Sequence, residues 1–323
     1  MTDQSIRNIP ASSKEMSLIE DEQHLANRRL VFCINSGRAG SGYLAQLLDS
    51  AVDTYAYHEP EPKMIKADLD LINQLPYEQT FQQRSRKVAG LKNKLRSLPE
   101  KSVYCETSHM FIKTFFDVAI DAFPGQIEVI ALRRYLPKVL KSFIELGYFS
   151  ATNQAWPRWM SSPNAATSAI PCIADDNELD QYDLSIAYLI DIEARLLRFK
   201  AMHPDIKVHE MRVENFKDIA LVESFFTSLG ITASQETYHL HSKPANTRKS
   251  RKKKYSGNQK VDLNYCTERI ENYVDKARNL GIEIPATLAM DEITPKTSDI
   301  VKDGLVSRLQ ASINRKLTFR KRI

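Results

Sequence analysis

The sequence predicts an α/β protein of three layers, in which helices flank a parallel sheet, with helical insertions. Short apolar runs of strand length recur along the 323-residue chain, and stretches with helical periodicity separate them. This alternation is typical of βαβ units and a parallel sheet. A turn rich in glycine and serine follows the first run, at the edge of the sheet where such folds bind ligands. A chain of this length can bury a large core without covalent cross-links.

The predicted strands are short and mostly apolar. The first, residues 29–35 (RLVFCIN), is an almost continuous apolar run, as expected for a strand buried on both faces. The others are expected at residues 54–58, 102–106, 127–132 and 206–211. Between and after them, helical periodicity predicts helices at residues 43–51, 81–98, 111–123, 137–146, 179–202 and 216–229.

The chain is predicted to form one α/β domain with appendages. Residues 1–27 are polar and are interpreted as a flexible N-terminal arm, followed by the α/β domain at residues 28–260. Residues 148–177 contain both tryptophans and read as an ordered insertion. Residues 261–323 are expected to form a C-terminal helical appendage with a basic tail.

Composition places the chain among soluble, cytoplasmic enzymes. Hydrophobic residues make up 42% and charged residues 26%, which is ordinary for globular proteins and excludes disorder of the whole chain. No apolar run approaches the roughly 18 residues that span a bilayer, and the polar start does not resemble a secretory signal. The four cysteines form no CxxC pair, which argues against zinc and for reduced thiols.

The positive charge is concentrated in two late segments. Residues 243–260 carry eight Lys/Arg and residues 304–323 carry six, with no acidic residue in either. Removing these fourteen from the 45 basic residues leaves 31 against 40 acidic ones, so the body is acidic. This pattern favours a local anion-binding loop and a basic tail, and no nucleic-acid partner is expected.

The strongest local signal is the strand–loop–helix unit around the sequence NSGRAGSGYL, residues 35–44. Three glycines let backbone N–H groups approach an anion, and the start of the next helix adds partial positive charge. The spacing of Gly37 and Gly42 imitates a Walker A loop, but Tyr43 and Leu44 replace its Lys-Ser/Thr pair. A magnesium-dependent nucleoside triphosphatase is therefore disfavoured. The alternative is a tight turn without a ligand.

This loop resembles the 5′-phosphosulfate-binding loop of P-loop sulfotransferases, in which Arg38, Gly40, Ser41 and Leu44 match the family pattern. Gly42 departs from it, because the family usually has a hydroxyl there; that contact is expected to pass to Ser41 or to backbone N–H groups. The resemblance implies the co-substrate 3′-phosphoadenosine 5′-phosphosulfate (PAPS), no metal, and transfer to a hydroxyl-bearing acceptor.

A second sulfotransferase motif occurs at an independent place. In that family a strand ends in an arginine, and a serine eight residues later helps to hold the 3′-phosphate. Arg134 and Ser142 have this spacing, although Tyr135 and Leu136 replace the usual residues after the arginine. A guanidinium fork and a hydroxyl suit phosphate oxygens. The alternative is that Arg133 and Arg134 lie in solvent and Ser142 on a surface helix.

Polar residues after the next two strands are candidates for catalysis and acceptor binding. By resemblance, Glu59 is the first choice for the base that deprotonates the acceptor hydroxyl, and His58 is the second. We expect the two side chains to point to opposite faces of an extended strand. Glu106 and His109 are predicted to contact the acceptor, Glu106 also as a support residue. Thr107 or Ser108 is predicted to cap the next helix.

The basic segment resembles the family's late nucleotide-covering loop only by position and charge. Arg248 is its candidate cofactor ligand, and a solvated loop is an equal alternative. The tail at residues 315–322 is expected to be solvated or to contact another subunit, with membrane contact as the less favoured alternative. In full, the resemblance implies that the nucleotide is bound by Ser36, Gly37, Arg38, Ala39, Gly40, Ser41, Gly42, Tyr43, Arg134, Ser142 and Arg248.

The sequence thus predicts a cytoplasmic PAPS-dependent sulfotransferase with Glu59, His58 and Arg38 as catalytic residues. A carbohydrate or small molecule is preferred over a protein as the acceptor. Two alternatives stay open: a P-loop nucleotide-binding, kinase-like enzyme, and a non-catalytic polyanion-binding module.

Overall fold

The computed structural model describes residues 25–151, 153, 156–241 and 261–292. Its centre is a five-stranded sheet in the order β2-β3-β1-β4-β5, in which all neighbours are parallel. The strands are β1 (Arg29–Ile34), β2 (Thr54–Tyr57), β3 (Val103–Glu106), β4 (Ile127–Arg133) and β5 (Val208–Arg212). All five lie where the sequence predicts them, with ends that differ by one or two residues.

Strand β1 lies at the centre of the sheet, with β3 on one side and β4 on the other. The strands that follow β1 are thus added first on one side (β2 and β3) and then on the other (β4 and β5). At this switch point the loops after β1 and β4 separate and leave room for a ligand at the carboxyl edge of the sheet. The glycine-rich loop follows β1 directly, so the strand order itself places it there.

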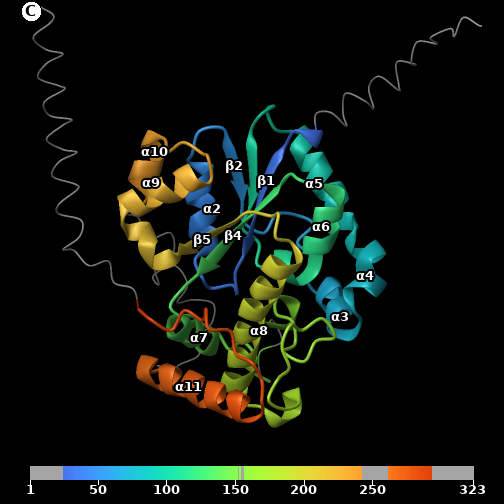
Figure 1. Cartoon of the computed structure of the whole chain (residues 1–323), viewed down its shortest axis with the longest axis vertical. Helices are drawn as coiled ribbons and strands as arrows, with labels where there is room; N and C mark the ends of the chain where they lie inside the picture. The colour runs from blue at the N-terminus through green and yellow to red at the C-terminus, as the bar shows by residue number, and fades with distance from the viewer. Residues whose placement is uncertain (1–24, 152, 154–155, 242–260, 293–323) are drawn as a thin grey trace, which may run out of the picture. The chain divides into compact units, whose positions relative to one another are not determined.

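Helices cover both faces of the sheet, which confirms the three-layer α/β prediction (Figure 1). One face packs against α2 (Ser41–Asp49) and α9 (Ile219–Ser228), with α10 (Gln235–Leu240) beside α2. The other face packs against α5 (Arg86–Arg96), α6 (Phe116–Ala122), α8 (Gln181–Met202) and a π-helical turn, η1 (Phe111–Phe115). The remaining larger helices are α3 (Ala67–Gln74), α4 (Tyr77–Arg84), α7 (Leu136–Glu145) and α11 (Leu263–Asn279).

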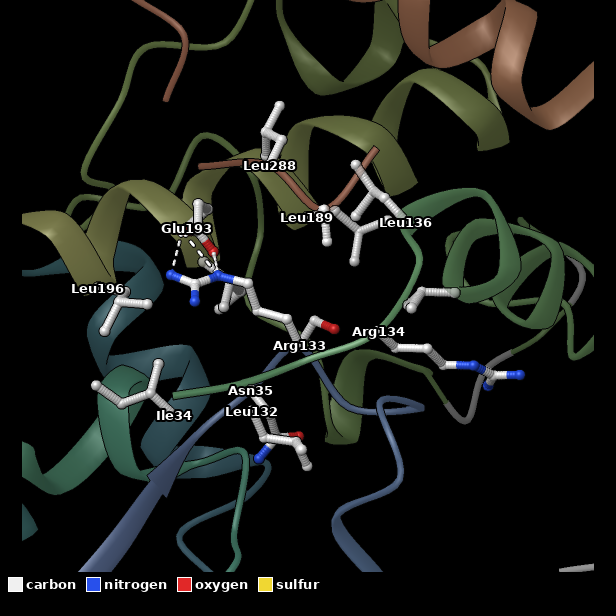
Figure 2. Close-up of a pocket in the computed structure, with 14 residues that line it drawn as sticks. Ile34, Asn35, Leu132, Arg133, Arg134, Leu136, Leu189, Glu193, Leu196 and Leu288 are labelled. Carbon is white, nitrogen blue, oxygen red and sulfur yellow. Dashed lines mark hydrogen bonds and ion pairs between the residues drawn. The ribbon is translucent and has the colours of Figure 1, made fainter. Parts of the chain in front are cut away.

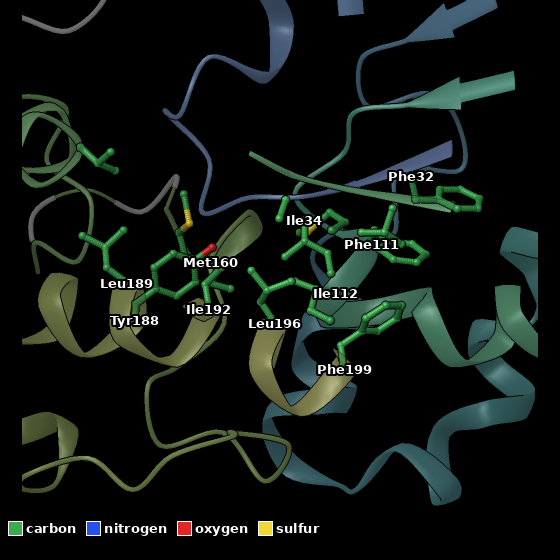
Figure 3. Packing of buried hydrophobic residues seen from close by; sticks show 14 of the residues in the cluster. Phe32, Ile34, Phe111, Ile112, Met160, Tyr188, Leu189, Ile192, Leu196 and Phe199 are labelled. Carbon is green, nitrogen blue, oxygen red and sulfur yellow. The ribbon is translucent and has the colours of Figure 1, made fainter. Parts of the chain in front are cut away.

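The larger core lies between the sheet and α8. Phe32 of β1 stacks on Phe111 with ring centroids 4.6 Å apart, and Phe199 of α8 packs edge-on against Phe111 (Figure 3). Tyr188 belongs to the same cluster but carries a hydroxyl, which a buried tyrosine must satisfy with a hydrogen bond. That hydroxyl is part of the candidate site described below.

Two predicted helices are interrupted. The helix expected at residues 81–98 is divided between α4 and α5 at Ser85, whose hydroxyl donates to the Phe81 carbonyl at 2.9 Å. Such a bond competes with the helix ladder and bends the chain. The helix expected at residues 111–123 begins as a π-helical turn and becomes α-helical only at Phe116.

The C-terminal boundary also differs from the predicted one. Helix α11, placed in an appendage that starts at residue 261, packs on α7 and α8, and its buried side chains join the main core. The compact unit extends to Met290. The predicted N-terminal arm up to residue 24, the basic segment and the basic tail lie outside the described residues. Among the helices that are described, none is long and apolar enough to cross a membrane.

Candidate active site

The loop after β1 has the backbone that its glycines predict. Gly37, Arg38 and Gly40 have φ angles of 78°, 57° and 94°, so the chain coils tightly between β1 and α2. The Asn35 side-chain oxygen accepts from the Gly37 N–H at 2.9 Å and closes the first turn. Helix α2 starts with no side-chain cap and no acidic residue in its first turn. Its N-terminus is therefore suited to an anion.

Gly40 is required by close packing as well as by its φ angle. A Cβ atom at Gly40 would lie 2.5 Å from a methyl carbon of Val213, in the segment after β5. Real Cβ atoms do not approach that closely, so any side chain would push the loop away from β5. The glycine thus holds the loop against the neighbouring strand end.

We expect Gly40→Ala to lower the free energy of unfolding by about 2–4 kcal/mol, which combines left-handed strain with overpacking. Urea unfolding measures this loss. Gly125→Ala is the matched control, because Gly125 has a φ of 72° and open space around its Cβ position. Equal losses in the two variants would contradict the contact with Val213.

The two predicted nucleotide motifs meet in the structure. Arg38 Nε donates to Ser142 Oγ at 3.0 Å, although the residues are 104 positions apart. Arg134 Nη1 donates to the Arg38 carbonyl, also at 3.0 Å. Burial lowers the pKa of the Arg134 guanidinium, partly offset by the Glu214 carboxylate. Two guanidinium groups and a hydroxyl therefore converge beside the uncapped N-terminus of α2.

Arg133 and Arg134 are adjacent but point in opposite directions (Figure 2). Arg133 pairs with Glu193 of α8 at 2.7 Å and with Glu210 of β5, which fixes β4 against its neighbours. Both arginines border a cavity of about 40 Å³ whose walls are mostly aliphatic. Of the arginine pair, Arg133 therefore has a structural role, and Arg134 is the one that reaches the loop.

His58 and Glu59 lie beside the glycine loop, but not in the predicted conformation. Strand β2 ends at Tyr57, and Glu59 has a left-handed φ of 52°. The expectation that the two side chains point to opposite faces is wrong, because the left-handed residue turns them together: Glu59 Oε1 lies 3.8 Å from His58 Nε2. The His58 ring lies over Gly42: a Cβ atom added at Gly42 would be 3.5 Å from the ring.

Glu59 is held between two imidazoles. Its Oε1 atom also lies 3.3 Å from Nε2 of His109, and the carboxylate keeps about a fifth of its surface exposed. His109 in turn lies against the loop: a Cβ atom added at Gly37 would be 3.5 Å from its Nδ1 atom. Since a left-handed non-glycine residue is costly, the surroundings must fix this carboxylate firmly. The Glu59 carboxylate is therefore partly exposed and lies next to two imidazoles that themselves pack against the loop.

Glu106 occupies a different environment from the one expected of an acceptor ligand. Its carboxylate is buried and accepts from Lys87 Nζ at 2.8 Å and from the Tyr104 hydroxyl at 2.9 Å. Burial raises the pKa of Glu106, which Lys87 offsets in part. Lys87 also donates to the Pro62 carbonyl at 3.2 Å, so the pair supports the segment that carries Glu59. The geometry favours the support role.

The predicted caps after β3 are arranged differently. Thr107 does not cap a helix: its hydroxyl lies 3.2 Å from Nδ1 of His58. Ser108 Oγ accepts from the Met110 N–H, one residue before the π-helical turn begins. Both residues therefore serve the site, since Thr107 orients His58 and Ser108 shapes the turn that presents His109.

Other predicted loop residues are placed as follows. Ala39 and Ser41 are buried, and the Tyr43 side chain donates to the Leu240 carbonyl at 2.8 Å, away from Arg38. The N–H groups of Gly37 and Tyr43 are already bonded, to Asn35 and to the Gly40 carbonyl. The N–H groups of residues 38–42, which lie between these two, are the candidates for phosphate oxygens. Arg248 lies outside the described residues.

Sequence reasoning missed two buried polar residues behind His109. Lys113 Nζ lies 3.0 Å from His109 Nδ1 and 3.0 Å from the hydroxyl of Tyr188, which donates to the Ser36 carbonyl at 3.2 Å. The spacing of His109 and Lys113 by four residues, as on one helix face, was an available signal. The sequence around Tyr188 contains no such signal, because its pattern predicts an aromatic core residue of α8.

The residues present fit a nucleotide with phosphates at both ends of its ribose. The left-handed turns and the α2 N-terminus form a cradle for one anion, and Arg134 with Ser142 offers donors for a second. Among the residues that the structure describes, no group of three or more His, Cys, Asp or Glu side chains is arranged to hold a metal ion.

No protein-family model matches the chain, and no curated protein matches it either. Solved structures similar to it include a sulfotransferase domain from the curacin biosynthetic pathway, with a TM-score of 0.45 and 15% identity over 80% of this chain and 99% of that domain. A sulfotransferase from Alicyclobacillus acidocaldarius gives a TM-score of 0.42 and 13% identity over 78% and 95%. Retinol dehydratase in complex with androsterone and inactive cofactor PAP gives 0.39 and 14% over 86% and 87%.

Proposed function

We propose that this chain transfers a sulfuryl group from PAPS to an acceptor hydroxyl. The observation that carries the proposal is the direct contact between the two phosphate motifs, in which Arg38 bonds Ser142 and Arg134 bonds the Arg38 carbonyl. If the arginine pair were only a solvent-exposed strand end and the glycine loop only a tight turn, no direct contact between them would be expected. A nucleotide with both a 3′-phosphate and a 5′-phosphosulfate requires both motifs at one edge of the sheet.

PAPS would supply the sulfuryl group and leave as adenosine 3′,5′-bisphosphate (PAP). In this assignment Arg134 and Ser142 bind the 3′-phosphate. The N–H groups of residues 38–42 and the Arg38 guanidinium bind the 5′-phosphosulfate. Fixed donors aimed at the phosphate that leaves stabilise the charge that develops there. Arg38 is suited to connect the two ends, because it already bonds Ser142.

The acceptor hydroxyl must lose a proton, and Glu59 is the group that we assign to take it. Its carboxylate is partly exposed, faces the loop and is held by two imidazoles. His58 is the alternative base, since its side chain is more exposed and lies over Gly42. Trp159 stacks on His109 and gives the acceptor side an aromatic wall. We propose a carbohydrate or small-molecule acceptor, for which such a wall is suited.

A cytoplasmic location is part of the proposal. The four cysteines are free thiols, and three of them are buried, as expected for a reducing compartment.

Transfer can be tested with radiolabelled PAPS and a panel of glycans, phenols and alcohols as acceptors. We expect label on an acceptor and stoichiometric release of PAP, without added magnesium. Transfer from ATP and magnesium, with none from PAPS, would favour the kinase-like alternative and contradict the proposal.

Arg134→Ala should weaken PAP binding by about 1.5–3 kcal/mol, the usual contribution of a charged hydrogen bond. Binding of adenosine 5′-monophosphate (AMP), which lacks the 3′-phosphate, should change little. Calorimetric titration measures both. Arg133→Ala is the matched control, because Arg133 pairs with Glu193 and points away; it should cost stability without changing the preference for PAP. Equal losses for both nucleotides in Arg134→Ala would show a structural role instead.

A further inference from the structure

Behind His109 lies a lysine with no access to solvent. Lys113 Nζ has three partners: the Trp159 carbonyl at 2.7 Å, the Tyr188 hydroxyl at 3.0 Å and Nδ1 of His109 at 3.0 Å. It also lies near the face of the Tyr188 ring, 5.2 Å from the centroid. Burial of a lysine costs free energy of folding unless each of its N–H donors has an acceptor. We therefore asked what this lysine does for the residues that it contacts.

The hydrogen-bond inventory fixes where the protons are. The Trp159 carbonyl only accepts, and the Tyr188 hydroxyl donates to the Ser36 carbonyl, so it accepts from Lys113. An ammonium has three protons, and the third goes to Nδ1 of His109. Nδ1 is then an acceptor, and the neutral ring must carry its proton on Nε2. Nε2 is the ring atom nearest the Glu59 carboxylate, 3.3 Å from its Oε1 atom.

Burial acts against a charge on either side chain, so the intrinsic basicity of the two groups decides which of them is charged. Burial lowers the pKa of His109, and the Lys113 and His58 charges lower it further. Burial also lowers the pKa of Lys113; Arg195 of α8 acts in the same direction, while Glu59 and Asp191 oppose it. The pair is too close to carry two charges, and the lysine is intrinsically the stronger base. The histidine is therefore the neutral partner.

We propose that Lys113 is a positioning residue that holds His109 as the Nε2–H tautomer, so that an N–H edge of the ring, and not a nitrogen lone pair, lies next to the Glu59 carboxylate and keeps it in place for the acceptor. Through Tyr188 the same lysine is tied to the Ser36 carbonyl, and the orientation of the base is coupled to the glycine loop. The inference rests on the proposed function, since it assigns the carboxylate its task.

The tautomer of His109 can be read in the wild-type protein by long-range ¹H–¹⁵N correlation of the imidazole nitrogens. We expect a neutral ring with the proton on Nε2, unchanged from about pH 6 to about pH 8. A neutral ring protonated on Nδ1, or an imidazolium at neutral pH, would overturn the proposal. This reading needs no variant and no acceptor.

Lys113→Met should abolish the single tautomer: both neutral forms appear, and the pKa of the ring rises, although burial still keeps it below the ordinary histidine range. Tyr188→Phe is the matched control, because it removes the link to Ser36 and keeps the contact between Lys113 and His109; it should keep the Nε2–H form. Retention of that form in a folded Lys113→Met protein would overturn the proposal.

PAP binding distinguishes this inference from the proposed function. Lys113 contacts neither Arg134 nor Arg38, and the Tyr188 hydroxyl can still donate to the Ser36 carbonyl without it, so Lys113→Met should bind PAP with close to wild-type affinity. If the wild-type protein does not bind PAP but shows the Nε2–H tautomer of His109, the result counts against the proposed function alone. A protein that binds PAP but has the other tautomer would count against the role of Lys113 alone.

Discussion

Glu59→Gln should lower the turnover number for sulfuryl transfer by about 10²–10⁴, the usual contribution of a general base. Glutamine keeps the shape of the side chain and its position next to the two imidazoles but cannot take a proton. PAP affinity should be unchanged, because Arg38, Arg134 and Ser142 lie on other elements. Steady-state kinetics with the acceptor found by the transfer screen, together with PAP titration, measure both quantities.

His58→Ala is the matched control for Glu59→Gln. The His58 ring lies over Gly42 and contacts Thr107, so its removal costs packing but leaves the carboxylate and its contact to His109 in place. We expect the smaller loss of turnover in this variant. Near-normal turnover in Glu59→Gln, with a large loss in His58→Ala, would exchange the two roles.

Lys87→Met should lower the free energy of unfolding by about 3–5 kcal/mol, because it leaves the Glu106 carboxylate buried without its cation. Both side chains of this pair are about 1% exposed. Chemical denaturation measures the loss. Lys92→Met on the same helix, where the side chain is partly exposed, should change stability by less than about 1 kcal/mol.

The double variant Lys87→Met with Glu106→Gln separates charge from packing. Without a buried carboxylate, most of the loss should be recovered, and the two substitutions should be far from additive. Additive losses would show that Lys87 stabilises α5 by packing alone and would remove the support role assigned to Glu106.

The sheet and the glycine loop were predictable because their constraints are local. A strand buried on both faces must be apolar along its length, and β1 is. A left-handed turn packed against a neighbour needs glycine, and Gly40 has both features. The spacing from Arg134 to Ser142 places a serine on α7 near the end of β4, which is why the second motif was also found.

The support of the Glu59 carboxylate, the proposed base, was not predictable in the same way. Lys87 precedes Glu106 by nineteen residues without any periodic relation, and only the packing of α5 brings them together. The left-handed backbone of Glu59 has no signature either, since the proline after it favours an extended residue. Such features depend on contacts between segments that are far apart in the sequence. Burial strengthens the interactions in these contacts, so they determine the local structure.

The central claim is that one site recognises both a 3′- and a 5′-phosphate, and a comparison of PAP with AMP in thermal unfolding tests it most directly. A ligand that binds only the folded state raises the melting temperature, and the increase grows with its affinity at a given concentration. We predict a clearly larger increase with PAP than with AMP at equal concentration, and no difference between them in Arg134→Ala. An equal increase with both nucleotides in the wild-type protein, or none with either, would contradict the claim.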